Sequence, residues 1–136
     1  MAFVEELIDV APARLARLWT DMWNRLREAG ELVSGDCRVY FGRRPQIDRP
    51  AATTGPQELQ DGIDGIAWEY PGIRYGFESA PRHQRDGNEG GLITLLWNVE
   101  VPGAPRRSGI DLLRWRSGRI VEVWSITADL ELPAMR

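Results

Sequence analysis

The sequence contains no lysine, one histidine and one cysteine in 136 residues. The single cysteine, Cys37, excludes an internal disulfide and a metal site built on several cysteines. The single histidine, His83, lies in a polar segment, so we expect no Ser/His/Asp catalytic set. All 17 basic residues are arginine and 20 residues are acidic, a balance that argues against a nucleic-acid partner. Because no metal-ligand cluster and no glycine-rich phosphate loop occurs, we expect no metal and no cofactor.

Long hydrophobic runs are also missing. No segment approaches the length of a transmembrane helix, and Glu5, Glu6 and Asp9 interrupt the apolar residues near the N-terminus. We therefore expect no signal peptide, no membrane partner and a cytoplasmic protein. A length of 136 residues fits a single domain, residues 1–136, that buries a core without disulfides.

Tryptophan is abundant, with six residues against three Tyr and three Phe. Its ring is large and its N–H needs a partner, so tryptophan lines pockets and interfaces as well as cores. Trp19, Trp23, Trp115 and Trp124, with Phe41, would form an aromatic-lined cavity if the helical ones pack on the predicted sheet. The alternative for Trp19 and Trp23 is plain core packing, which is typical of apolar residues at helical spacing.

Helices are predicted in three places. Apolar spacing over residues 3–8 predicts a short helix. A second helix begins at Pro12 and ends near Gly30, because apolar residues recur at helical spacing between them. A third begins at Pro56 and buries one face as far as Ile66.

Strands dominate the second half of the chain. They are predicted at 36–41, 73–77, 92–101, 108–115 and 119–127, with polar loops at 42–55 and 80–91. Separate runs of helices and strands predict an α+β fold, in which a curved antiparallel sheet carries the helices on one face. Because the strands are apolar on both faces, we expect a homodimer through the outer sheet face.

The segments 109–115 and 117–124 resemble the closing hairpin of the nuclear transport factor 2-like superfamily, and are most similar to its SnoaL-like and ketosteroid-isomerase-like members. The order of the predicted elements matches this fold along almost the whole chain. The resemblance implies a cone-shaped apolar pocket between helices and sheet. It implies no single reaction, because the superfamily includes isomerases, polyketide cyclases, dehydratases, epoxide hydrolases and members without known activity.

Asp111 matches the carboxyl that the isomerases hold protonated so that it donates a hydrogen bond to an oxyanion. Trp124 matches an aromatic position that lines the pocket in some of these enzymes. Other catalytic positions differ. Phe41 stands where the isomerases carry a general base, and Val123 and Ser125 stand where cyclase-like members carry His and Asp.

Asp111 is therefore the candidate catalytic residue. Burial in a tryptophan-lined cavity would raise its pKa, and the neutral carboxyl could then donate a hydrogen bond or a proton. The alternative is that Asp111 accepts hydrogen bonds from a Trp N–H or a hydroxyl and only orders the pocket wall. Glu100 and His83 are expected to be solvated. The candidate ligand-binding residues are Trp19, Phe41, Asn98, Trp115 and Trp124.

These features favour a protein that binds an apolar, oxygen-bearing small molecule of polyketide-, terpenoid- or steroid-like type. If the protein is an enzyme, its chemistry should be proton transfer without a cofactor, as in isomerisation, cyclisation, dehydration or epoxide opening. The incomplete catalytic sets keep an alternative open, a non-catalytic module for ligand binding or dimerisation.

Overall fold

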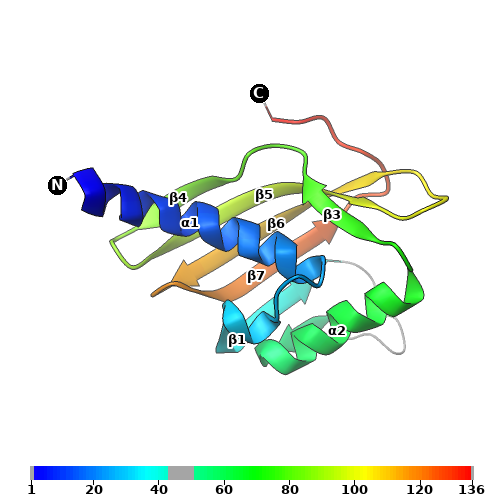
Figure 1. Ribbon diagram of the computed structural model, residues 1–136, viewed down its shortest axis with the longest axis horizontal. Helices are drawn as coiled ribbons and strands as arrows, with labels where there is room; N and C mark the ends of the chain where they lie inside the picture. Colours follow the sequence, from blue (N-terminus) through cyan, green and yellow to red (C-terminus); the bar gives the residue numbers. More distant parts are fainter. Residues whose placement is uncertain (1, 43–50, 136) are drawn as a thin grey trace.

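The computed structural model describes residues 2–42 and 51–135, with side chains from residue 11 onward. A long helix and a short one cross a curved sheet (Figure 1). In chain order the elements are α1 (Ala2–Trp23), the 3-10 helix η1 (Ala29–Glu31), β1 (Val33–Phe41), β2 (Ala52–Thr54), α2 (Gly55–Glu69), β3 (Arg74–Phe77), β4 (Arg82–Asp86), β5 (Gly90–Glu100), β6 (Arg107–Arg116) and β7 (Arg119–Thr127).

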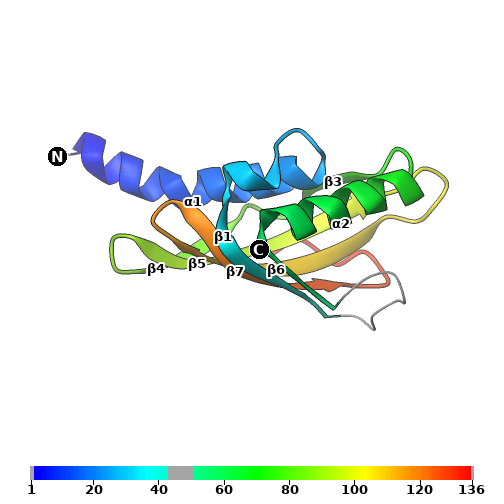
Figure 2. The ribbon, with the colours of Figure 1, turned by 90° about the horizontal axis from the view of Figure 1, so that it is seen from below.

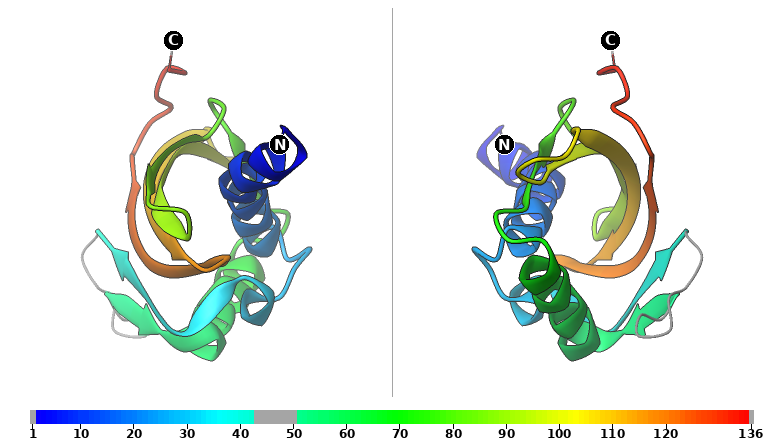
Figure 3. Two further views of the ribbon diagram at one scale, coloured as in Figure 1. Left: turned by 90° about the vertical axis from the view of Figure 1, so that its left-hand side faces the viewer. Right: turned by 90° about the vertical axis from the view of Figure 1, so that its right-hand side faces the viewer.

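The sheet has seven strands in the order β2-β1-β7-β6-β5-β3, and β4 also pairs with β5. All pairs are antiparallel except β1 and β7, which run parallel. The ladders shift register between Val33 and Arg38 and between Arg114 and Trp115, and such bulges bend a sheet. Viewed along its length, the sheet curls around α1 and α2, which lie on its concave side (Figures 2 and 3). The predicted α+β class is thereby confirmed.

The N-terminal half differs from the prediction at both ends of α1. One helix runs through Pro12, where two helices were predicted, although an interior proline removes one helical hydrogen bond and disfavours the turn before it. The helix then ends at Trp23 and not near Gly30. Arg25 adopts a left-handed backbone (φ 63°), and the N–H of Leu26 donates to the Asp21 carbonyl at 2.8 Å. This is the hydrogen-bond pattern of a Schellman cap.

Two short strands were not predicted. The described part of the predicted loop at 42–55 contains β2, and residues 43–50 of that loop lie outside the described residues. The predicted loop at 80–91 contains β4, which pairs with β5 from Arg82↔Thr94 to Asp86↔Gly90. The β4 segment is Arg-His-Gln-Arg-Asp, so backbone pairing forms this strand without any apolar alternation. His83 is exposed, as expected, but lies on a strand.

The core fills the space between the helices and the concave face of the sheet. It contains Trp19 and Met22 from α1, and Leu59 and Ile63 from α2, which begins at Gly55, one residue before the predicted start at Pro56. The opposite face is partly apolar and exposed. Ile110 and Ile126, which pair across β6 and β7, are 45% and 58% exposed. Within the described residues no helix is long and apolar enough to cross a membrane.

Candidate functional site

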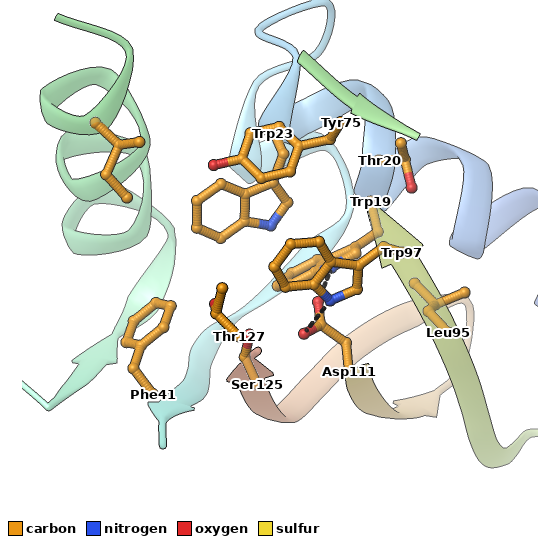
Figure 4. Close-up of a pocket in the computed structure, with 11 residues that line it drawn as sticks. Trp19, Thr20, Trp23, Phe41, Tyr75, Leu95, Trp97, Asp111, Ser125 and Thr127 are labelled. Carbon is orange, nitrogen blue, oxygen red and sulfur yellow. Dashed lines mark hydrogen bonds between the residues drawn. The ribbon is translucent and has the colours of Figure 1, made fainter. Parts of the chain in front are cut away.

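A pocket lies between the C-terminal half of α1 and the concave face of the sheet. Its walls come from both helices and from strands on each side of the sheet (Figure 4). The cavity has a volume of about 50 Å³, which corresponds to roughly three to five water molecules at ~10–15 Å³ each. The lining residues are Trp19, Thr20, Trp23, Phe41, Ile66, Tyr75, Leu95, Trp97, Asp111, Ser125 and Thr127.

Asp111 provides the ionisable group of this pocket. It lies on β6 opposite Leu95 of β5 and Ser125 of β7, and its side chain is only 3% exposed. Trp19 Nε1 donates to Oδ2 at 2.8 Å, and Trp97 Nε1 donates to Oδ1 at 2.9 Å. An indole nitrogen can only donate, so each Trp anchors one oxygen of the carboxyl.

Two physical effects act on the protonation of Asp111. Burial raises its pKa, because a charge in an apolar interior loses its hydration. Hydrogen bonds from Ser125, Trp19 and Trp97 oppose that rise, because they favour the charged form. Burial is the larger effect, so Asp111 keeps its proton to a higher pH than an exposed aspartate does. A neutral carboxyl in this position can donate a hydrogen bond into the cavity while both indoles remain bound.

Gly109 determines where Trp97 can lie. The two residues pair across β5 and β6, and a Cβ at Gly109 would overlap the Trp97 indole ring. Glycine therefore lets the ring lie flat across β6, with Nε1 reaching Asp111 two residues further along the strand. On the other side of the cavity Trp19 is 1% exposed and lies on the apolar face of α1.

The other end of the pocket is closed by aromatic rings without a charged group. The Trp23 ring lies 6.2 Å from Trp19, 6.4 Å from Phe41 and 5.4 Å from Tyr75, measured between ring centroids. Asn24 fixes this end of the pocket. Its side chain donates to the Tyr75 carbonyl at 2.9 Å and accepts from the Tyr75 N–H at 2.8 Å.

Comparison with known proteins identifies the fold. No protein-family model and no curated protein sequence matches the chain. Solved structures do match. A proposed isomerase of the SnoaL-like family from Agrobacterium tumefaciens is 18% identical, with a TM-score of 0.67 over 88% of this chain and 98% of that one. The chain has the nuclear transport factor 2-like fold.

Two further structures agree with this assignment. An NTF2-like protein of unknown function from Mesorhizobium loti is 19% identical, with a TM-score of 0.61 over 87% of this chain and 91% of that one. A protein with a ketosteroid isomerase-like fold from Catenulispora acidiphila, solved in complex with trimethylamine, is 16% identical, with a TM-score of 0.59 over 82% of each chain. Identities this low establish the NTF2-like fold but no shared reaction.

The NTF2-like pocket brings together three of the six predicted site residues, Asp111, Trp19 and Phe41. Trp115 also points to the concave side, but it lies further along β6. Its ring is under the Arg85 guanidinium at 5.5 Å, and it borders a different hollow beside the turn between β4 and β5. The predicted placement of Trp115 in the main pocket is therefore wrong.

Trp124 and Asn98 lie on the outer face, which corrects the prediction for both. Val123 and Ser125 point inward, so Trp124 between them must point outward, where it stacks on Tyr40 at 6.0 Å. Asn98 follows Trp97 along β5 and pairs with Ser108, and alternation again directs it away from the pocket.

Glu100 lies on the same outer face as Asn98 and, as expected, is partly solvated. Arg74 contacts it at 2.8 Å and Arg106 at 3.2 Å. The hydrogen bond from Arg74 holds the pKa of Glu100 below its usual value.

Several lining residues were not predicted as site residues. Trp97, Tyr75 and Leu95 come from strands whose register is not visible in the sequence. Trp23 was predicted as a wall of the aromatic cavity but not as a ligand-binding residue. Ser125 shares the inward face of β7 with Val123, so its position could be read from the strand pattern. Among the described residues, no group of three or more His, Cys, Asp or Glu could hold a metal ion. Of the described lining residues, only Asp111 belongs to the Asp, Glu, His, Lys and Arg set.

Proposed function

We propose that the protein binds a small, apolar, oxygen-bearing molecule in the NTF2-like pocket, with Asp111 donating a hydrogen bond to the ligand oxygen. The observation that carries this proposal is a fully buried carboxyl at the wall of an aromatic cavity, each of its oxygens bound to an indole N–H. The trimethylamine complex of a structural neighbour supports small-molecule binding by this fold. With the side chains in these positions, about 50 Å³ is too little space for a four-ring steroid.

Asp111 also supports a chemical step, the enolisation of a bound ketone. The carboxyl proton moves to the carbonyl oxygen, while a proton on the neighbouring carbon is lost to water. The carboxylate then recovers a proton from the hydronium ion so formed, which regenerates water. The raised pKa extends the pH range over which the carboxyl can donate its proton, and the aromatic walls reduce contact of the ligand with bulk water.

Exchange of carbon-bound protons in D₂O tests this step. We expect the protein to accelerate α-proton exchange of cyclohexanone, followed by proton NMR. The Asp111→Asn variant should lose about 10²-fold or more of that acceleration, the usual contribution of a general acid or base. Glu100→Gln is the matched control, because it makes the same change at a carboxyl on the outer face, and its rate should equal that of the wild type. Equal rates in wild type and Asp111→Asn would contradict a catalytic role.

A second candidate function is a non-catalytic module for ligand binding or dimerisation. Its support is that Asp111 has no second acid or base beside it among the described lining residues, and that both its oxygens are already hydrogen-bonded. Ligand binding without faster proton exchange would favour this function over catalysis.

A homodimer through the outer sheet face is part of either proposal. Ile110, Ile126 and the Tyr40–Trp124 stack give this face an apolar surface that a second copy would cover. We expect light scattering to give twice the chain mass for the wild type and the chain mass for Ile126→Asp. A wild-type monomer at high concentration would contradict the dimer.

A further inference from the structure

Trp23 lies at the aromatic end of the pocket. Trp23 is the last residue of α1 and lies against Trp19, Phe41 and Tyr75, with centroid distances of 5.4–6.4 Å. It is in ring contact with three of the other four aromatic residues that line the pocket. In Figure 4 its indole lies between Tyr75 and Phe41, on the side of the cavity away from Asp111.

The position of Trp23 is fixed by its neighbours in the chain. Asn24 holds the Tyr75 backbone with two hydrogen bonds, at 2.8 and 2.9 Å, and therefore ties the edge strand β3 to the end of α1. The left-handed Arg25 ends the helix immediately afterwards. These contacts hold the backbone at Trp23, and a ligand that displaced the ring would have to break its contacts with Trp19, Phe41 and Tyr75.

The other two tryptophans of the pocket, Trp19 and Trp97, have a different structural role. Trp19 and Trp97 each donate to an Asp111 oxygen, so removing either ring also removes a partner of the buried carboxyl. Trp23 takes no part in those hydrogen bonds and is only half-buried. Its ring can be trimmed while the carboxyl keeps both partners.

We propose that Trp23 sets the upper size limit of the ligand and restricts the pocket to carbonyl compounds of about one ring. This inference rests on the proposed function, because it assumes that the ligand oxygen lies at Asp111. The reason is geometric. The ligand must fit between the Asp111 carboxyl on one side of the pocket and the Trp23 ring on the other. Loss of the indole would add the volume of a second ring next to that space.

Calorimetric binding of three ketones tests the limit: 2-cyclohexen-1-one with one ring, 1-decalone with two, and a steroid enone with four. We expect the wild type to bind the one-ring compound best. Trp23→Ala should bind 1-decalone about tenfold or more tightly than the wild type does, because the added methylenes become buried, and should bind 2-cyclohexen-1-one more weakly. Trp68→Ala is the matched control, since Trp68 on α2 is 88% exposed and does not line the pocket. Trp68→Ala should bind the three ketones in the same order of affinity as the wild type.

Three outcomes separate this inference from the proposed function. A shift in preference toward the two-ring compound, seen only in Trp23→Ala, supports the inference. An unchanged order in a folded Trp23→Ala, with wild-type binding of the one-ring ketone intact, overturns the inference and leaves the proposed function standing. Absence of binding by all three proteins contradicts both. If Trp23→Ala fails to fold, Trp23→Phe should shift the preference in the same direction by a smaller factor, and no shift would overturn the inference.

Discussion

The two ends of the pocket are built in different ways. At one end Asp111, Trp19 and Trp97 are at most 9% exposed and are joined by directed hydrogen bonds. At the other end Trp23 and Phe41 are half-buried and meet through ring contacts. Directed bonds fix atoms to within a narrow range of geometry, whereas ring contacts tolerate changes of shape. The carboxyl end is therefore suited to chemistry or recognition, and the aromatic end to the selection of ligand size.

Replacing the carboxyl should have the largest effect on stability. Asp111→Leu leaves two buried indole N–H groups without an acceptor, at about 1–3 kcal/mol each, so the free energy of unfolding should fall by about 2–6 kcal/mol. Asp111→Asn should lose less, because the amide oxygen still accepts from one indole. Urea denaturation measures both variants. Equal stability of Asp111→Leu and wild type would show that the indole hydrogen bonds do not hold this end together.

A methyl group at Gly109 should have a smaller effect at the same end. Gly109→Ala places its Cβ against the Trp97 indole, which must move away from Asp111, at a cost of about 1–3 kcal/mol. Gly62→Ala in α2 is the matched control, because its Cβ would meet nothing within 4 Å. It should stabilise the protein by about 0.5–1 kcal/mol. If both alanine variants are equally stable, the close approach of Trp97 to β6 does not contribute to the stability of the protein.

The smallest effect is expected at the aromatic end. Asn24→Ala removes two partly exposed hydrogen bonds to Tyr75, so the free energy of unfolding should fall by about 1–2 kcal/mol. Asn88→Ala, at an exposed position in a turn, is the control and should change stability by less than about 0.5 kcal/mol. If Asn24→Ala lowered the free energy of unfolding more than Asp111→Leu does, the aromatic end would contribute more to stability than the carboxyl end.

Much of the fold could be predicted from the sequence, because alternating apolar and polar residues indicate strands and turn residues indicate where the strands end. β7 was predicted with its observed bounds, and the family resemblance, not a strand pattern, assigned Asp111 to the pocket that it lines. β4 could not be predicted, because backbone pairing with β5 forms it without an apolar pattern. The two helices predicted at the N-terminus form one helix, which continues through Pro12.

The candidate site was harder to predict than the fold. Trp97 reaches Asp111 only because β5 and β6 pair in a register that places it over Gly109, and the sequence does not display that register. Trp124 was assigned to the pocket by the family resemblance, although the inward direction of Val123 and Ser125 requires it to point outward. Local alternation was the better guide at this position.

The central claim is that Asp111 is a buried proton donor, and the direct measurement is its titration by ¹³C NMR of the side-chain carboxyl, assigned with Asp111→Asn. We predict that its pKa lies above the usual value for aspartate, because burial outweighs the three hydrogen bonds that favour the charged form. The folded protein then holds a proton that the unfolded chain has lost, so this carboxyl lowers stability as the pH rises from the unfolded to the folded pKa. A measured pKa at or below the usual value would mean that Asp111 is a carboxylate that only orders the pocket wall, and would contradict the account.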